Sequence, residues 1–279
     1  QDFFSAESYR GTKYGNISPK IITTIAMFYD LDRPLPFAED VKEILHDDGI
    51  WVLQLSYTPL MIKQLAFDNI CHEHICYYSL ESIKYLMDKI GFDIVDCILD
   101  DVNGGSFRIY LMKSEADKTK FRNQQQRDVA DFRVNSILKY EKSLKLKDPE
   151  TYRNFYKQIC GLREKTVSFI KGEKEKGKSI WGYGASTKGS TLMQWYGLNN
   201  EHVDFIAERS EYKFGMKTAG TSIPICSEDE MRKEQPDYLL ILPWHFIAEF
   251  SEREKEYIDN GGKFIVPCPK FMIYPSEDK

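Results

Sequence analysis

The sequence predicts an α/β protein in which two α/β segments are joined by a helical one. Short runs rich in Ile, Val, Leu and aromatic residues alternate with stretches of helical period in the first and last parts of the chain. Residues 114–176, by contrast, are polar, charged and helical in period throughout. The predicted domains are therefore residues 1–113, a helical connector over 114–176, and a Rossmann-like parallel-sheet domain over 177–279.

Residues 1–113 show alternating strands and helices that end in a hairpin. Ser79 is a good N-cap and Gly91 suits the position after a helix, so a helix is predicted between them. Asn103-Gly104-Gly105 predicts the turn of a hairpin. The other predicted elements are a helix at 37–45, strands at 21–28 and 50–55 that suit buried parallel pairing, and hairpin strands at 92–98 and 107–112.

The last segment is a regular α/β series. Each crossover carries a helix or a comparable length of chain, so parallel order is the economical arrangement. Ser227 and Glu230 predict a capping box, and Asp148-Pro149 predicts the start of a helix in the connector. The predicted elements are strands at 179–183, 203–207, 222–225, 238–242 and 264–266, with helices at 187–196, after Ser227, and near 246–258.

Composition narrows the class of function. The net charge is −5 and the pI about 5.7, which disfavours a sequence-independent grip on nucleic acid phosphates. No apolar run is long enough to span a bilayer, so we expect no membrane partner. Six scattered cysteines without a CxxC pair argue against a zinc ribbon or a disulfide framework, and predict a reduced, cytoplasmic setting.

A glycine-rich loop lies between a predicted strand and a predicted helix. Its sequence is Gly182-Tyr183-Gly184-Ala185-Ser186-Thr187-Lys188-Gly189. Glycines let the backbone approach an anion, while Ser186, Thr187 and Lys188 add hydroxyl donors and a positive charge. It is not a Walker A loop, and Thr187 occupies the third position of GxGxxG. Glu208, at the end of the next strand, lies where dinucleotide folds place a ribose-binding acid. Anion binding is favoured over a plain tight turn.

His72-Glu73-His74 follows the second predicted strand, where open α/β sheets bind ligands. An extended segment would point His72 and His74 one way and Glu73 the other. Histidine beside an acid can remove a proton next to a carbonyl. The spacing is not HExxH, and two histidines alone are too few for a metal site. A structural histidine pair is the alternative.

Two further positions are candidates. Asn103-Gly104-Gly105-Ser106 is explained by the hairpin turn, and a functional role requires Ser106 or Arg108 to reach a pocket. Tyr29 follows the first strand and is placed to meet a ligand, although single tyrosines usually belong to a core or a rim.

Together and in this order, these segments resemble the sugar-nucleotide C-methyltransferases, over nearly the whole chain. The co-occurrence of the His-Glu-His segment and the glycine loop is the specific part. The resembling pieces are Met27-Phe28-Tyr29-Asp30-Leu31, Ile70-Cys71-His72-Glu73-His74, Tyr77-Tyr78-Ser79-Leu80, Asn103-Gly104-Gly105-Ser106, the glycine loop, Glu208-Arg209, Lys213, Gly215 and Gly220-Thr221-Ser222-Ile223-Pro224-Ile225.

The resemblance implies a three-part enzyme with a zinc module, an S-adenosylmethionine domain and a C-terminal domain that helps hold a nucleoside-diphosphate keto-sugar. A base removes a proton beside the ketone, and the enolate attacks the methyl group of S-adenosylmethionine. His74 matches the base and Glu73 its neighbouring substrate contact. Tyr29 stands near a position where some members have His, and Cys71 where many have Tyr. The implied substrate-binding set is His72, Tyr77, Ser106, Arg108, Gly182, Gly184, Ser186, Thr187, Lys188, Gly189, Glu208 and Lys213.

Residues 1–113 then correspond to the second half of the S-adenosylmethionine domain. Neither a CxxC pair nor a glycine-rich loop precedes Ile21, so we expect a fragment without zinc, whose S-adenosylmethionine site lies largely outside it. Tight binding of that cofactor by this chain alone would contradict the expectation. An NAD(P)-dependent oxidoreductase built on the Gly182 loop and a non-catalytic sugar-nucleotide-binding module are the alternatives. The sugar, carbon, nucleotide and oligomeric state stay open.

Overall fold

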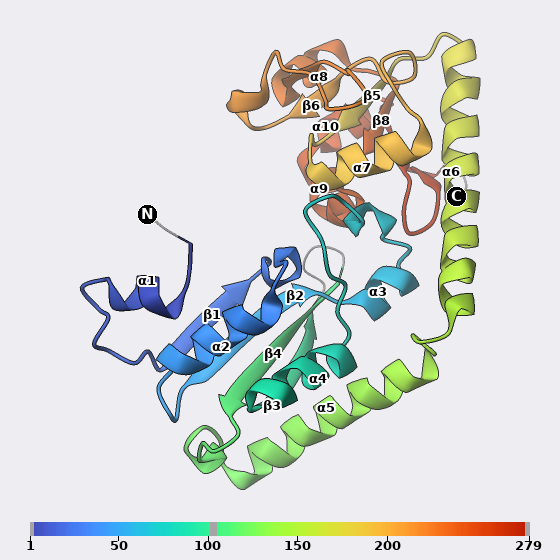
Figure 1. The fold of residues 1–279 in the computed structure, drawn as a ribbon. Coiled ribbons are helices and arrows are strands. Elements are labelled where there is room, and N and C mark those ends of the chain that lie inside the picture. Colours follow the sequence, from blue (N-terminus) through green and yellow to red (C-terminus); the bar gives the residue numbers. More distant parts are fainter. Residues whose placement is uncertain (1–2, 101–104, 277–279) are drawn as a thin grey trace. The chain divides into compact units, whose positions relative to one another are not determined.

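The computed structural model describes residues 3–100 and 105–276. It divides the chain into two compact units, coloured along the sequence in Figure 1. The first unit contains Gln1–Met61 and His72–Thr151, and the second contains Ile62–Cys71 and Tyr152–Lys279. The second unit therefore includes a ten-residue segment that interrupts the first unit in sequence.

The first unit is built on a four-stranded sheet with the order β1-β2-β4-β3. Strand β1 is parallel to β2, while β4 is antiparallel to both of its neighbours. The large buried side chains of its core include Phe28, Trp51, Phe92 and Phe107. The strands are β1 (Ile21–Ile25), β2 (Ile50–Ser56), β3 (Phe92–Asp100) and β4 (Ser106–Lys113), and the helices are α1 (Ala6–Arg10), α2 (Pro34–Ile44), α3 (Thr58–Lys63, shared with the second unit), α4 (Leu80–Ile90) and α5 (Gln124–Ser143).

The first strand is parallel, as predicted, but the prediction that it is buried was wrong. Within the described sheet β1 pairs only with β2, so it lies at an edge. Ile21 and Ile25 are accordingly 66% and 57% exposed. The strand also ends at Ile25 rather than Phe28, because Ala26 takes a φ of 54° and a 3-10 turn, η1 (Phe28–Asp30), follows.

Helix α4 begins and ends where the sequence predicted. Ser79 caps its N-terminus by accepting from the backbone N–H of Ser82, and Gly91 follows its C-terminus with a φ of 87°. The first turn has a second acceptor that the sequence did not reveal. The buried carboxylate of Glu141, on α5, accepts from the N–H groups of Leu80 at 2.6 Å and Glu81 at 2.9 Å. Helix α5 therefore belongs to the first unit.

The predicted connector is thus divided between the two units. Helix α5 packs on β3 and α4, whereas most of α6 (Pro149–Glu175) belongs to the second unit. The units meet in sequence at Thr151, not at residues 113 and 176. The start of α6 agrees with the prediction, since Asp148 accepts from the N–H of Glu150 at 2.9 Å. The functional roles assigned to 1–113, 114–176 and 177–279 stay predictions.

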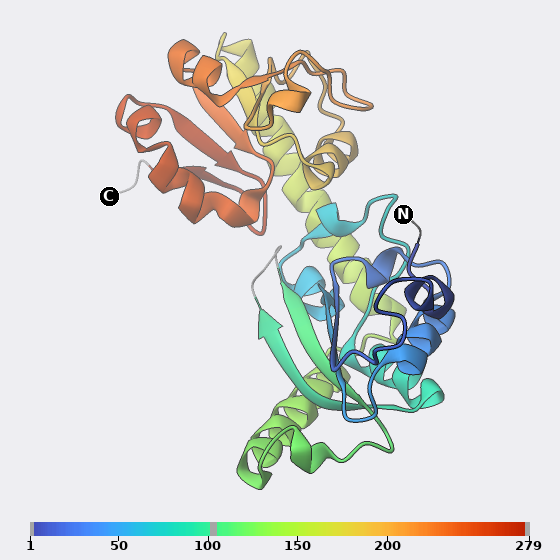
Figure 2. The same ribbon diagram turned by 90° about the vertical axis from the view of Figure 1, so that its left-hand side faces the viewer.

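The second unit is built on a six-stranded sheet with the order β10-β9-β8-β5-β6-β7. The predicted parallel order holds from β9 to β7, and the unpredicted β10 adds an antiparallel edge. Figure 2 shows the same ribbon turned by 90° about the vertical axis. The strands are β5 (Ile180–Tyr183), β6 (Ile206–Glu208), β7 (Ile225–Ser227), β8 (Tyr238–Ile241), β9 (Lys263–Val266) and β10 (Met272–Tyr274), and the remaining helices are α7 (Thr187–Tyr196), α8 (Glu228–Glu234), α9 (Ile247–Arg253) and α10 (Lys255–Asp259).

Two local predictions in this unit need correction. Of the two hydrogen bonds of the predicted capping box, the structure shows the one in which the Ser227 hydroxyl accepts from Glu230 N–H at 3.0 Å. The single helix predicted near 246–258 is two helices, α9 and α10, that break at Glu254. The buried Glu254 carboxylate accepts from Tyr183 Oη at 2.6 Å and from Arg232, so a tertiary network holds the residue at the break.

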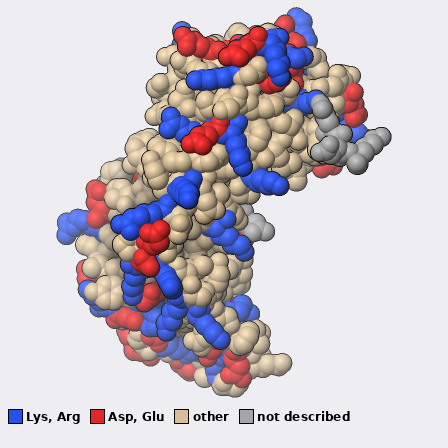
Figure 3. All heavy atoms as spheres, turned by 90° about the vertical axis from the view of Figure 1, so that its right-hand side faces the viewer, with Lys and Arg blue, Asp and Glu red and all other residues tan. Residues whose placement is uncertain are grey.

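The surface carries both signs of charge. Basic and acidic side chains are interspersed on the face drawn in Figure 3. Within residues 3–100 and 105–276, no helix combines the length and the apolar character needed to cross a membrane.

Replacing Glu141 with Gln should destabilise the first unit. The glutamine NH2 group would replace either Oε1, which accepts from the Tyr57 hydroxyl and Leu80 N–H, or Oε2, which accepts from Glu81 N–H, so in either case a backbone N–H group would lose its acceptor. We expect E141Q to lower the free energy of unfolding by about 2–4 kcal/mol in urea titrations. The control is E81Q, because the Glu81 side chain is 48% exposed and pairs only with exposed Lys147 among the described residues. Equal effects of the two substitutions would contradict this role of Glu141.

Candidate functional site

The His-Glu-His segment lies in the first unit, against the turn that follows β1. The backbone N–H groups of Ile75 and Cys76 both donate to the carbonyl of Tyr29, each at 3.0 Å. The Tyr29 ring is buried, and its centroid lies 4.3 Å from that of the half-buried His74 ring. The structure thus brings together two of the three residues predicted to be catalytic.

The third residue, Glu73, lies on the surface with His72. Their side chains are 53% and 83% exposed, and His72 Nε2 is 3.7 Å from Glu73 Oε1. The extended conformation on which the predicted facing of these side chains depended does not form, because the chain makes a turn at His72 and Glu73. Tyr77, a predicted substrate contact, is 39% exposed further along the same segment.

Asp30 is a neighbour of this group that sequence reasoning did not select. It ends η1, directly after the buried Tyr29. Burial raises the pKa of the Asp30 carboxyl, the negative charge of Glu73 raises it further, and His74 lowers it. Asp30 therefore interacts electrostatically with both Glu73 and His74. Its place after the carboxyl end of a strand was the available signal.

Ser106 and Arg108, on β4, are held by a residue that the sequence analysis missed. Gln54, buried on β2, accepts from Arg108 Nε at 2.9 Å and contacts the hydroxyl of Ser106 at 3.5 Å. A single amide within an otherwise apolar strand was the signal for it. Gly105 has a φ of 112°, and a Cβ there would lie 2.7 Å from Leu60, so glycine is required at this end of the turn. The other predicted turn residues, 103 and 104, lie outside the described residues.

Four N–H groups of the glycine loop already have acceptors within the second unit. Gly184 N–H donates to Ala207 and Ser186 N–H to Gly184, while Ala185 N–H donates to the carboxylate of Glu208 at 2.9 Å. Ser186 caps α7 by accepting from Gly189 N–H at 3.0 Å. In this conformation, these four groups are not available to an anion, in contrast to the sequence-based expectation.

Two of the loop's glycines are needed for packing. A Cβ at Gly182 would lie 2.4 Å from the Ile206 side chain, and a Cβ at Gly189 would lie 2.8 Å from that of Leu242. The close approach at Gly182 lets β5 lie beside β6, and the close approach at Gly189 lets α7 pack on the sheet. Gly184 is different, since its φ of 86° makes the sharp exit from β5.

Glu208 and Lys213 hold the loop in place. The Glu208 carboxylate also accepts from Arg209 and Ser210 N–H, and Lys213 Nζ donates to the carbonyl of Ala185 at 2.7 Å. Burial raises the pKa of Glu208, but the Ser210 N–H group and Lys213 outweigh burial, so this pKa lies below its usual range. Glu208 is thus a carboxylate already surrounded by donors.

Lys188 interacts with a buried carboxylate of the same unit. Burial lowers the pKa of Lys188, and the charge of Asp68 opposes this shift. Asp68 is 1% exposed and accepts from Trp244 Nε1 at 3.0 Å. Asp68 lies two residues before the segment Ile70-Cys71-His72-Glu73-His74 and was not among the site residues predicted from the sequence.

A cavity of about 390 Å³ opens at the carboxyl ends of β5, β6 and β8. Neighbouring strands β5 and β8 start the two halves of this sheet, and open α/β sheets bind ligands at such a switch point. Of the predicted residues Gly184, Ser186, Glu208 and Lys213 line it, and Gly182, Thr187, Lys188 and Gly189 do not. Its other lining residues are Tyr183, Ala185, Arg209, Glu228, Pro243, Phe246, Glu249, Phe250 and Arg253.

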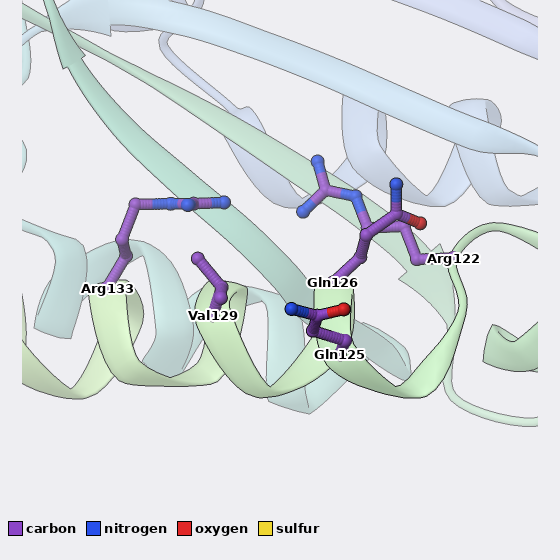
Figure 4. Close-up of a pocket in the computed structure, with 5 residues that line it drawn as sticks. All are labelled: Arg122, Gln125, Gln126, Val129 and Arg133. Atoms are coloured by element: carbon purple, nitrogen blue, oxygen red, sulfur yellow. The ribbon is translucent and has the colours of Figure 1, made fainter.

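A second cavity, of about 330 Å³, lies in the first unit along α5 (Figure 4). Arg122 and Arg133 point toward each other across it, above Val129. Both guanidinium groups pair with the fully buried Asp96, at 2.5 Å and 2.7 Å. No predicted site residue lines this cavity. Nowhere in the described ranges are three or more His, Cys, Asp or Glu side chains grouped to hold a metal ion.

Two family models match this chain, and they meet near residue 100 rather than at Thr151, where the structural units meet. Residues 101–269 match the model of the C-methyltransferase C-terminal domain, and residues 3–96 match a methyltransferase domain. The chain belongs to the C-methyltransferase family. This methyltransferase-family chain is 33% identical over 237 residues to the C-methyltransferase NovU of Streptomyces niveus. The match covers 85% of this chain and 54% of that relative, so the chain spans about half the length of the curated relative it matches.

The electrostatic grouping around Asp30 can be tested by NMR of carboxyl carbons. Because the charge of Glu73 raises the pKa of Asp30 and His74 lowers it, E73Q should lower this pKa and H74Q should raise it. The control, D88N, removes an exposed carboxylate on α4 that pairs with Lys84 and should leave the Asp30 titration unchanged. Shifts of the same sign in E73Q and H74Q would contradict the grouping.

Asp68 and His245 should give opposite pH dependences of stability. Burial raises the pKa of Asp68 from 3.8 to about 6, so folding gains a proton there and stability falls as pH rises from 4 to 6. Burial, aided by Lys188, lowers the pKa of His245 from 6.5 to about 4, so stability rises over the same window.

Each substitution removes one of these opposing contributions. Relative to wild type, D68N should therefore gain stability more steeply between pH 4 and 6, and H245Q less steeply. Urea titrations across this window measure both slopes. Slopes identical to that of wild type in both variants would contradict the two shifts.

Proposed function

We propose that this chain is part of an S-adenosylmethionine-dependent C-methyltransferase that acts on a nucleoside-diphosphate keto-sugar. Membership of the C-methyltransferase family supports the transferred group and the bond that is formed. One observation carries the proposal furthest. The His74 ring packs on buried Tyr29 and interacts electrostatically with Asp30. This arrangement suits a base that must acquire and hold a positive charge.

The proposed reaction begins with a proton transfer to His74. A ring nitrogen of neutral His74 takes a proton from the carbon next to the sugar ketone, and the electron pair of the C–H bond forms an enolate. His74 becomes an imidazolium, which the carboxylate of Asp30 stabilises electrostatically. Tyr29 limits the ring's movement by packing against it. The enolate carbon would then be the nucleophile toward the methyl group, whose bond to the donor's sulfur would break with both electrons left on that sulfur.

S-adenosylmethionine supplies that methyl group in enzymes of this class. Among the described residues of the first unit, no glycine-rich loop joins a strand to a helix, which is how such folds hold a nucleoside cofactor. The described residues therefore do not fit the cofactor by themselves. The steps derived for this chain are those of the sugar and its proton.

The 390 Å³ cavity of the second unit is the proposed site for the nucleotide part of the substrate. Lys213, Arg209 and Arg253 bring positive charge to its lining, and Phe246 offers an aromatic face that is 41% exposed. The internally bonded N–H groups of the glycine loop disfavour a redox dinucleotide whose pyrophosphate would sit on them. Thr187 and Lys188 do not line this cavity and are not part of the proposed site. All six cysteines are free, which supports the proposed reduced, cytoplasmic setting.

Exchange of the substrate's own proton tests the base directly. In the intact protein, H74N should slow the wash-in of deuterium next to the ketone by about 10²–10⁴-fold, and methyl transfer with it. Mass spectrometry of the nucleotide sugar in D2O measures the exchange. The matched variant is H72N, whose side chain is 83% exposed in the wild type. We expect it to raise KM while leaving exchange at saturating substrate within about tenfold. Wild-type exchange in H74N would remove His74 from the mechanism.

A further inference from the structure

Residues 67–71 belong to the second unit and continue directly into His72-Glu73-His74, which belongs to the first. We propose that Asp68, Trp244 and Lys188 form an anchor that fixes this end of the His-Glu-His segment, so that they act as positioning residues for His74. The inference rests on the proposed function only in that it takes His74 to be the base.

Apolar packing provides the first part of the anchor. The 3-10 turn η2 (Phe67–Asn69) packs on α7, within the second unit (Figure 1). The ring of Phe67 lies 5.6 Å from that of Tyr196, and these side chains are 3% and 1% exposed. Burial of two large aromatic side chains fixes the position of the turn on the helix.

Polar contacts provide the second part and set the register of the turn. Trp244 Nε1, itself buried, donates to Asp68 Oδ2 at 3.0 Å. Asn69 Nδ2 donates to the carbonyl of Ala66 at 3.1 Å, and Ile70 N–H to that of Phe67 at 2.8 Å. A carboxylate that is 1% exposed is costly unless it is both hydrogen-bonded and charge-paired, so its partners restrict where the turn can lie.

Lys188 supplies the opposite charge. Its ammonium group interacts with the Asp68 carboxylate, and each charge opposes the effect of burial on the other. Lys188 is absent from the lining of the cavity proposed for the nucleotide. The lysine of the glycine loop is thereby assigned to the anchor rather than to a phosphate.

The short length of chain between fixed points makes the anchor relevant to His74. Before the His-Glu-His segment, the Ile70 N–H group donates to the carbonyl of Phe67. After it, the N–H groups of Ile75 and Cys76 donate to the Tyr29 carbonyl. A residue spans at most about 3.6 Å, so a displacement of η2 has few residues over which to dissipate before it reaches His74. Misplacement of a catalytic group by about 1 Å costs on the order of 10²-fold in rate.

The test compares D68N, K188M, W244F and the D68N/K188M pair in the intact protein. W244F keeps both charges and an aromatic side chain, although a smaller one, and removes the N–H donor to Asp68, so it replaces D68N in the test if D68N does not fold. The controls are D229N, since the Asp229 side chain is 92% exposed, and K213M, which changes a lysine of the cavity lining. Hydrogen exchange over residues 70–76, affinity for UDP and dTDP by calorimetry, and kcat and KM are measured for each.

We expect each anchor variant to speed exchange at residues 70–76 by about tenfold or more and to lower kcat by about 10–100-fold, with nucleotide affinity within twofold of wild type. The D68N/K188M double variant should lower kcat and speed exchange no more than the more strongly affected single variant, because both substitutions break the same interaction. D229N should match wild type, whereas K213M should weaken nucleotide binding and leave exchange unchanged.

Two results would overturn the anchor. One is wild-type exchange at residues 70–76 in all the anchor variants, whatever their turnover. The other is a tenfold loss of nucleotide affinity in K188M that D68N does not share, which would make Lys188 a phosphate ligand. Faster exchange together with wild-type turnover would support the anchor and contradict His74 as the base, so the two proposals can fail separately.

Discussion

A backbone N–H group that is removed from water needs an acceptor, and in this protein carboxylates distant in sequence often supply it. Glu141 reaches from the end of α5 to the first turn of α4, where it also accepts from the Tyr57 hydroxyl at the end of β2. This contact joins a helix, a strand and a second helix of the first unit at one buried charge. In the second unit, Glu208 performs the same task for the loop after β5. The ends of secondary-structure elements, where the candidate sites lie, are therefore positioned by tertiary contacts.

The glycine loop illustrates the consequence for function. A strand, a glycine-rich turn and a helix are the usual surroundings of a bound anion. Here Glu208 occupies one of the N–H groups that such an anion would use, and Lys213 bonds to the Ala185 carbonyl. The open space lies beside the loop, between the strand ends and the side chains of Phe246 and Arg253. A ligand of this unit would meet side chains more than the loop's backbone.

The His-Glu-His segment is held by hydrogen bonds to buried acceptors at both of its ends. Asp68, held by Trp244, precedes it, and the Tyr29 carbonyl receives two N–H groups after it. Between these points, His74 packs on Tyr29 while His72 and Glu73 remain largely exposed. Such a segment can hold His74, the proposed base, in place while its neighbours remain accessible to a substrate. The proposed division of labour follows, with His74 as base and its exposed neighbours as contacts.

The sequence by itself determined the local structure that depends on near neighbours. Ser79 and Gly91 bound α4, Gly197 follows α7 with a φ of 68°, and the hydrophobic periods place nearly all the strands and helices, because caps and amphipathic patterns act within a few residues. The order of the His-Glu-His segment and the glycine loop also indicated the family. Only the tertiary structure decided that β1 lies at an edge of the described sheet, that α9 and α10 break at Glu254, and that Lys188 interacts with Asp68. These outcomes depend on burial and on charges brought from distant parts of the chain, which no local pattern encodes.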